Sequence, residues 1–268
     1  MSPSARSAPS LVVAGPIAGR DLTFEGVYRD HVQTVARWLT RLVNHTHPAS
    51  GINPTTIVPN APKTFADLKK PEYKGLVALN GDPRQSGAAF AGVMAASLAN
   101  GGSADDIMPG IQFFSDLKKS GNLAASDVTS ATLLSGETPI AIDWSYNLPG
   151  LQSQLEDAGL TVETDFPTDG VYGGFYSQGV VKDSPHQACA KLWIEHILSD
   201  EGALGYLQGG AMPARYQSLV DRGLVTEELK KNLPPDDLIA QIKFLTPAQI
   251  AAAKSVLEEN WGPMVADA

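Results

Sequence analysis

From about residue 51 onward, the chain alternates between two patterns of hydrophobic and polar positions. Short apolar runs predict buried strands at 76–80, 139–144, 160–164 and 179–182. Longer segments, with apolar residues every three or four positions, predict helices at 86–99, 107–120, 128–134, 149–158, 188–198, 201–207 and 247–260. This alternation predicts an α/β architecture with a largely parallel sheet, in which ligands bind beyond the carboxyl ends of the strands.

Capping residues mark the starts of two predicted helices. Thr64 is followed three residues later by Asp67, which predicts a helix start with Thr64 as its N-cap. Ser86 follows a turn at 81–85 and predicts the N-cap of the next helix, which ends before the Gly101–Gly102 pair.

The first 50 residues differ from the rest and are expected to form an atypical N-terminal segment. They contain three of the five histidines and predict one helix, at 24–43. His45 and His47 have the spacing of a metal-binding pair but no carboxylate nearby, so an accidental pair is expected and no metal site is predicted. The apolar run at 11–19 is short and interrupted by Pro16, so no secretory signal peptide is predicted.

Composition places the 268-residue chain among globular proteins of one large domain or two moderate ones. Hydrophobic residues make up 43% and charged residues 18%, which excludes a mostly disordered, collagen-like or coiled-coil chain. Asp and Glu number 29 against 20 Lys and Arg, and the resulting charge of −9 argues against a nucleic-acid partner. No run of the sequence approaches the roughly 20 apolar residues that span a bilayer.

Signatures of catalysis are mostly absent from the sequence. Cys189 is the single cysteine, which excludes an internal disulfide and a cysteine-based metal site, and its apolar neighbours predict a small buried thiol. His186 and His196 are interpreted as surface or packing residues. The chain has no Gly-x-Ser-x-Gly elbow, no phosphate-binding Gly-x-x-x-x-Gly-Lys loop and no Gly-x-Gly-x-x-Gly motif. No catalytic residue and no cofactor are therefore predicted.

The first candidate binding feature is the strand–turn–helix unit at 79–89. Its turn delivers Ser86 to the start of a helix, where free N–H groups and the helix dipole favour an anion or a carbonyl group. Gly87 has no side chain, so a ligand can approach the backbone there. Arg84 is either a ligand clamp or a solvent-facing turn residue. The alternative for the whole unit is an ordinary capped helix after a strand.

The second feature is the polar and aromatic cluster that ends the strand at 139–144. Trp144 and Tyr146 supply flat walls, and Asp143 can hold an amine or a hydroxyl group, as small-molecule clefts require. In the alternative interpretation, the two rings pack under a neighbouring helix and Asp143 caps that helix.

The third feature is the glycine- and aromatic-rich segment at 169–179, which contains Tyr172 and Tyr176. Glycine allows sharp bends and aromatic rings provide contact area, so the segment is either a ligand-lining crossover or a loop whose rings fill the edge of the core.

Several stretches of the chain carry a resemblance to a known family. They lie in order at 62–68, 71–75, 82–87 (Asp-Pro-Arg-Gln-Ser-Gly), 134–142, 198–202 and 209–215 (Gly-Gly-Ala-Met-Pro-Ala-Arg). By their order and spacing, residues 51–268 resemble the bacterial extracellular solute-binding proteins of ABC transporters. The similar branch includes binders of iron, thiamine, polyamines and phosphonates.

The resemblance implies a type II periplasmic-binding-protein-like fold, with two α/β lobes joined by a hinge and the ligand held between them. Residues 51–168 would form the hinge entry and lobe two, and 169–268 the return crossover and the helical part of lobe one. Family members have strand–helix units where this chain has its atypical residues 1–50. We therefore expect lobe one to be incomplete, and the chain alone to bind ligand poorly or to expose an apolar face.

On this resemblance, nine residues are expected to bind the ligand. From lobe two these are Arg84, Ser86, Gly87, Asp143, Trp144 and Tyr146; from the hinge or the other lobe they are Tyr172, Tyr176 and Arg215. The helix start and Arg84 favour a phosphonate or carboxylate, whereas Asp143 with Trp144 favours an amine, so a ligand with both groups would satisfy both. A ferric ion usually requires paired tyrosines; Tyr172 and Tyr176 are separated by three residues, which leaves iron open as a ligand without further support in the sequence.

The function implied is that of a solute-binding component of an ABC transporter, which captures a small polar ligand and presents it to a membrane permease. The resemblance also implies a periplasmic or extracellular location and a monomer. Two alternatives stay open: an enzyme of group-transfer type on a related two-lobe fold, and a non-functional truncated remnant.

Overall fold

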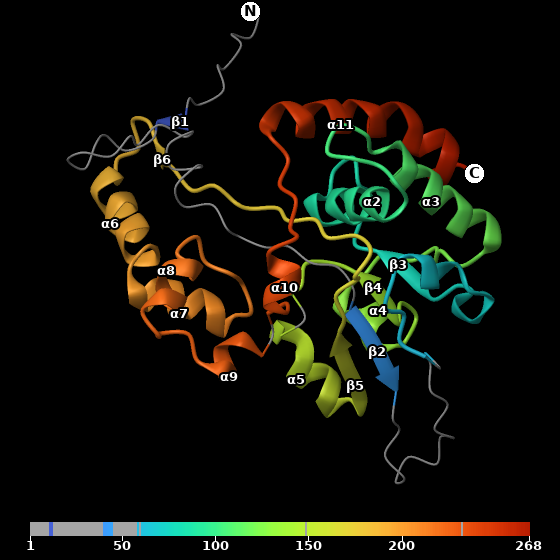
Figure 1. The fold of residues 1–268 in the computed structure, drawn as a ribbon, viewed down its shortest axis with the longest axis horizontal. Coiled ribbons are helices and arrows are strands. Elements are labelled where there is room, and N and C mark those ends of the chain that lie inside the picture. Colours follow the sequence, from blue (N-terminus) through green and yellow to red (C-terminus); the bar gives the residue numbers. More distant parts are fainter. Residues whose placement is uncertain (1–10, 13–39, 45–57, 59, 148, 232) are drawn as a thin grey trace, which may run out of the picture. The chain divides into compact units, whose positions relative to one another are not determined.

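The computed structural model describes residues 11–12, 40–44, 58, 60–147, 149–231 and 233–268 (Figure 1). The chain divides into two compact units. Unit 1 comprises Met1–Thr34 and Phe175–Leu229, and unit 2 comprises Val35–Gly174 and Lys230–Ala268. The histidines of the N-terminal segment, including His45 and His47, lie outside the described residues.

Unit 2 contains a four-stranded sheet in the order β3-β4-β2-β5. β3 (Val77–Leu79) and β4 (Ile140–Ile142) are parallel, as the sequence predicts. β2 (Thr40–Asn44) lies between β4 and β5 (Leu160–Thr164) and is antiparallel to both.

Two predictions about this sheet were therefore wrong. The sheet is mixed rather than largely parallel, and residues 40–43 belong to strand β2 rather than to the end of a helix. The physical reason is the same for both. β2 pairs along its whole length with β5, more than 100 residues away, and tertiary pairing of this kind overrides a local helical periodicity.

Helices α2 (Gly87–Ala99), α3 (Met108–Ser120) and α11 (Pro247–Trp261) accompany the sheet and share its core (Figure 1). α2 is buried from Ala88 to Ser97, and its small residues let α3 approach closely. A Cβ atom on Gly110 would lie 2.0 Å from the carbonyl oxygen of Val93, so only glycine fits at this crossing.

The C-terminal helix α11 belongs to unit 2 by its packing. Leu257 and Trp261 are buried in the same core cluster as α2 and α3, and the rings of Trp261 and Phe114 lie 5.8 Å apart. Residues 230–268 thus group with 35–174, whereas the sequence placed them with the helical part of lobe one. The apolar side chains of α11 made that helix predictable, but not which core it would cover.

Shorter elements complete unit 2. They are the 3₁₀ helices η2 (Ala66–Lys69) and η3 (Pro71–Tyr73), the helices α4 (Ser130–Leu134), α5 (Pro149–Asp157) and α10 (Asp236–Ile239), and the π-helical turn η4 (Gly262–Ala266).

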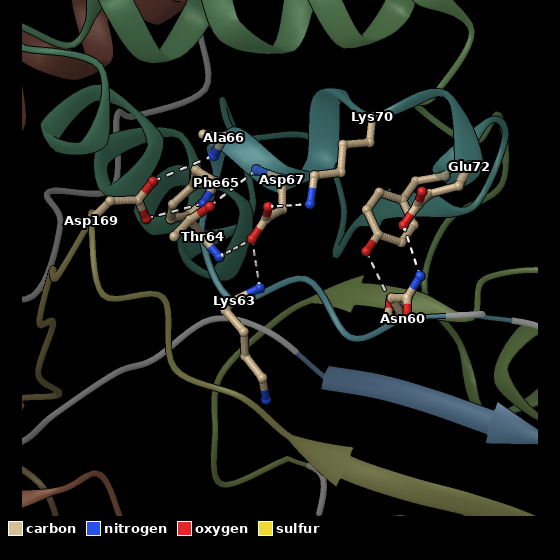
Figure 2. Close-up of polar contacts among 10 residues, drawn as sticks. Asn60, Lys63, Thr64, Phe65, Ala66, Asp67, Lys70, Glu72 and Asp169 are labelled. Atoms are coloured by element: carbon tan, nitrogen blue, oxygen red, sulfur yellow. Dashed lines mark hydrogen bonds and ion pairs between the residues drawn. The ribbon is translucent and has the colours of Figure 1, made fainter.

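The predicted contact between Thr64 and Asp67 forms, but Thr64 is not the N-cap: the element that follows is the 3₁₀ helix η2, whose N-cap is Phe65 (Figure 2). Asp67 N donates to Thr64 Oγ1 at 3.1 Å, and Asp67 Oδ2 accepts from the backbone nitrogens of Lys63 and Thr64, both at 3.0 Å. From the far side, Asp169 accepts from the backbone nitrogens of Phe65 and Ala66, at 3.0 and 3.4 Å. Two carboxylates therefore hold this segment, one local and one distant in sequence.

Unit 1 is mainly helical in its described residues. β6 (Val180–Val181) pairs antiparallel with β1 (Leu11–Val12), and the helices α6 (Gln187–Ile197), α7 (Asp200–Gln208), α8 (Tyr216–Asp221) and α9 (Glu227–Lys230) follow. Among the residues described in this unit, the buried apolar side chains include Val180, Ala203, Leu207, Met212, Tyr216 and Leu219.

Helix α6 has no buried residue among its eleven. Leu192 and Trp193 are 71% and 58% exposed. Cys189 is exposed as well, so the prediction of a buried thiol was wrong. The thiol faces outward because the helix uses its other side, at Ile194 and Ile197, for contact within the unit.

Within the described residues, none of the helices is long and apolar enough to cross a bilayer.

Candidate functional site

Three chain segments meet at the carboxyl edge of the parallel strand pair in unit 2. Asn80 follows β3 and Asp143 follows β4, and the two strand ends are joined where Asn80 N donates to the Ile142 carbonyl oxygen at 3.1 Å. Ser86 Oγ donates to the Asn80 carbonyl oxygen at 2.6 Å, which brings the start of α2 to the same edge.

The two rims predicted from the sequence are therefore neighbours. A Cβ atom placed on Gly87 would lie 3.8 Å from Cζ2 of Trp144, within ordinary van der Waals contact. Gly87 is exposed, and Ser86, Tyr146 and Asn147 are partly exposed, so this edge reaches solvent. That it binds a solute stays a prediction.

Ser86 acts as the N-cap of α2. It has an extended backbone, and its Oγ accepts from Ala89 N at 3.2 Å while donating to Asn80. Its hydroxyl is thus occupied by two contacts inside the protein, as the ordinary-cap interpretation expects. What the helix start offers a ligand is the backbone at Gly87 and the positive end of a 13-residue helix dipole.

Asp143 is buried, with 8% of its surface exposed, and its carboxylate is surrounded by donors from the protein. Oδ1 accepts from Trp144 N at 2.6 Å, and the side-chain nitrogen of Asn147 donates to Oδ1 at 3.0 Å and to Oδ2 at 3.1 Å. The Asn80 side chain is a further hydrogen-bond partner. Burial raises the pKa of Asp143 above its ordinary value, against the opposing effect of these hydrogen bonds.

Trp144 and Tyr146 form a stacked pair. Their ring centroids are 6.0 Å apart and the ring planes are inclined by 14°. Trp144 is buried beside the start of α2, and Tyr146 is partly exposed. A planar apolar surface or a cation can lie on such a pair, since the ring faces carry negative potential.

Arg84 is held by its own turn. Its Nε donates to Asp82 Oδ1 at 2.9 Å and to Oδ2 at 3.1 Å, and a terminal nitrogen also contacts Oδ2. This ion pair lowers the pKa of Asp82 and raises that of Arg84. A guanidinium already paired in this way favours the interpretation of Arg84 as a turn residue over that of a ligand clamp.

The other predicted residues are Tyr172, in unit 2, and Tyr176 and Arg215, in unit 1. Tyr172 is 4% exposed, and its ring packs edge-on against Phe90 of α2 at 6.4 Å, as the core-filling interpretation expects. Tyr176 is largely exposed, and Arg215 bonds to the Leu198 carbonyl oxygen at 2.6 Å and to Asp200 at 3.1 Å.

Asn80 and Asn147 both supply polar groups to Asp143. Asn147 ends the polar cluster that the sequence singled out after the strand at 139–144, but Asn80 was not considered as part of the site. Asn80 directly follows an apolar strand, which is the signal that singled out Asp143, and the same rule applied to both strands would have found it.

Comparison with known proteins identifies the chain's relatives. The family model described as bacterial extracellular solute-binding protein matches residues 42–242. No curated protein sequence matches the chain.

Solved structures of similar fold come from the same kind of protein. An ABC transporter from Clostridium perfringens has a TM-score of 0.59 at 18% identity, with 90% of this chain and 71% of that chain covered. The spermidine/putrescine ABC transporter substrate-binding protein PotD from Streptococcus pneumoniae has a TM-score of 0.56 at 18% identity, with the same coverage. The protein described as the Atu4243-GABA receptor has a TM-score of 0.57 at 19% identity, with 85% of this chain and 66% of that chain covered. At these identities the likeness shows the fold, which is that of type II periplasmic binding proteins.

Proposed function

The chain belongs to the bacterial extracellular solute-binding proteins, the solute-binding components of ABC transporters, and we propose that it captures a small polar solute at the carboxyl edge of β3 and β4. Outside the cytoplasm, the protein presents this solute to a membrane permease. It acts as a monomer and does not chemically alter the solute. The observation that carries the proposal is the contact between the α2 start and the Trp144 loop, at an edge that reaches solvent.

The chemistry of the edge favours a solute with an anionic group and an amine. The start of α2 at Gly87 suits a carboxylate or phosphonate, because it combines backbone N–H groups with the positive end of the helix dipole. The stacked Trp144 and Tyr146 rings suit an ammonium group through cation–π attraction. Two of the similar proteins have names that contain amine-bearing solutes, spermidine/putrescine in one and GABA in the other.

A ferric ion fits this edge less well. The two tyrosines considered for it are divided between the units, and Tyr172 is packed inside the core.

Arg84 contributes to an anion site only if its guanidinium leaves Asp82, which the bidentate ion pair opposes. Tyr176 and Arg215 stay predicted contributors from unit 1.

A thermal-shift screen tests the proposal, with γ-aminobutyrate, putrescine, a phosphonate and ferric ion as probes. A probe at one hundred times its dissociation constant stabilises the folded chain by about 2.7 kcal/mol. We expect γ-aminobutyrate to give the largest shift and ferric ion none. Stabilisation by ferric ion alone would refute the proposed solute class.

The group-transfer alternative is separated by recovery of the bound probe. A binding protein retains its ligand in stoichiometric amount through gel filtration and releases it unchanged on unfolding, whereas an enzyme converts it. The same column run reports whether the chain elutes as a monomer. Chemical conversion of any bound probe would favour the group-transfer enzyme over the binding protein.

A further inference from the structure

We propose that Asp143 is a positioning residue, which holds the Trp144–Tyr146 loop against the start of α2 and does not itself touch the solute. This inference rests on the proposed function for the purpose of the loop, but its geometry stands on contacts within unit 2. It replaces the expectation that the Asp143 carboxylate pairs directly with an amine.

The carboxylate is the centre of a network that joins three segments. Asn80 reaches it from the end of β3, and Trp144 N and the Asn147 side chain reach it from the loop after β4. Asn80 is bonded in turn to Ser86, the cap of α2. One buried acceptor thus connects the loop that carries the aromatic pair to the helix start that faces it.

These contacts use most of the capacity of the carboxylate. Its two oxygens offer about four acceptor positions, and three protein groups already donate to them: the Trp144 nitrogen, the Asn147 side-chain nitrogen, which contacts both oxygens, and the Asn80 side chain. Because Asp143 is also buried, with 8% of its surface exposed, little of the carboxylate is left for a solute amine. The 2.6 Å bond from Trp144 N is short, as expected for an ionised acceptor.

Burial makes this arrangement costly, which argues that it is not merely a local cap. An asparagine at position 143 would offer one acceptor oxygen instead of two and no charge, so it could not accept from the Asn147 amide at both positions. A carboxylate accepts from every side at once, although desolvation penalises its charge.

The loop orientation has a direct consequence for the candidate site. The Trp144 backbone nitrogen is tied to Asp143, and its ring lies 3.8 Å from the position of a Cβ on Gly87. Tyr146 stacks on that ring from two residues further on. Releasing the loop would separate the aromatic surface from the helix start without removing a single solute-contacting side chain.

Two variants of the full chain test the inference, Asp143→Asn and Asn147→Ala. Each removes part of the network, and Asn147→Ala does so at a partly exposed position, so it decides the question even where Asp143→Asn fails to fold. Asp67→Asn is the matched control, because it weakens another capping carboxylate of unit 2 that serves a different segment.

The first readout is hydrogen exchange of the Trp144 backbone amide, which needs no ligand. We expect exchange at least about tenfold faster in both network variants, with α2 amides unchanged, and no acceleration at Trp144 in Asp67→Asn. If the Trp144 amide exchanges at the same rate in Asp143→Asn, Asn147→Ala and Asp67→Asn, the inference is overturned.

The second readout is affinity for γ-aminobutyrate by calorimetry. Positioning predicts that Asn147→Ala and Asp143→Asn both lose affinity, roughly tenfold or more, in step with their exchange rates. Direct ion pairing predicts instead that only Asp143→Asn loses affinity, with Trp144 exchange unchanged, and that result also overturns the inference. If the wild-type chain binds no amine probe, the proposed solute class fails, while the exchange result still decides the role of Asp143.

Discussion

Stability towards acid gives the sharpest test of the forces that hold unit 2, at Asp67. This carboxylate accepts from two backbone nitrogens and pairs with Lys70 Nζ at 2.7 Å (Figure 2). Its hydrogen bond with Lys70 is the largest cause that lowers its pKa, from 3.8 to about 2. The perturbation is Asp67→Asn, which keeps one acceptor oxygen for the backbone and removes the charge.

The magnitude follows from the shift. Lowering a pKa from 3.8 to about 2 corresponds to about 2.4 kcal/mol, at 1.36 kcal/mol per unit. The Asp67 side chain keeps 22% exposure, so solvent screening reduces the expected contribution to about 1–2 kcal/mol. Because the folded-state pKa lies below the ordinary value, this contribution is present above pH 3.8 and is lost as the pH falls through about 2.

The assay is urea unfolding of wild type and Asp67→Asn at several pH values between 7 and 2.5. We expect the variant to be less stable by about 1–2 kcal/mol at pH 7, with the difference shrinking as the pH falls, since a protonated aspartate resembles asparagine. Asp236→Asn is the control, because Asp236 is largely exposed in its pair with Lys230 and should change stability by less than about 0.5 kcal/mol. A difference at Asp67 that is constant over this pH range would refute the reasoning.

Three further predictions concern packing, the site and the exposed helix. Gly110→Val should destabilise unit 2 by about 3 kcal/mol or more in urea unfolding, because its Cβ would lie 2.0 Å from a carbonyl oxygen of α2. The control is Gly150→Ala, which should change the free energy of unfolding by no more than about 1 kcal/mol, because no atom lies within 4 Å of its Cβ. Gly87→Val should lower the affinity for γ-aminobutyrate in calorimetry, because the branched side chain covers the helix start. The melting temperature should change little, because the added Cβ makes only ordinary van der Waals contact. Unchanged affinity would exclude this helix start from the site. Replacing Leu192 and Trp193 together by glutamine should change stability by less than about 0.5 kcal/mol and reduce binding of an apolar fluorescent dye, and a large loss of stability would show that these side chains are covered in solution.

Much of the local structure was predictable from the sequence. Ser86 caps α2 and Gly121, with φ of 78°, ends α3, because the polar cap and the left-handed glycine act within one or two turns of their own helix. The apolar runs after Gly75 and Pro139 form β3 and β4 as expected. Because β3 and β4 are parallel, the polar residues that follow them lie at one edge of the sheet.

The remainder depended on contacts between residues far apart in the chain. Tyr172 was an open choice between ligand and core until its ring was found packed against Phe90. Arg84 was similarly undecided until its pair with Asp82 was known, and Cys189 was placed in the wrong environment. In each case the residue type allowed both outcomes, and the neighbour that decided between them could not be read from local pattern.

By itself, the sequence indicated most of the longer helices, the strands β3 to β6, the family resemblance, and which polar residues follow the strands. Only the tertiary structure decided that β2 enters the sheet antiparallel, that α11 covers the core of unit 2, and that the Asp143 carboxylate bonds to its own protein. Periodicity and capping act over a few residues, so the local sequence is enough to predict them. Strand pairing, burial and the hydrogen bonding of a buried charge depend on which distant segments the folded chain brings together.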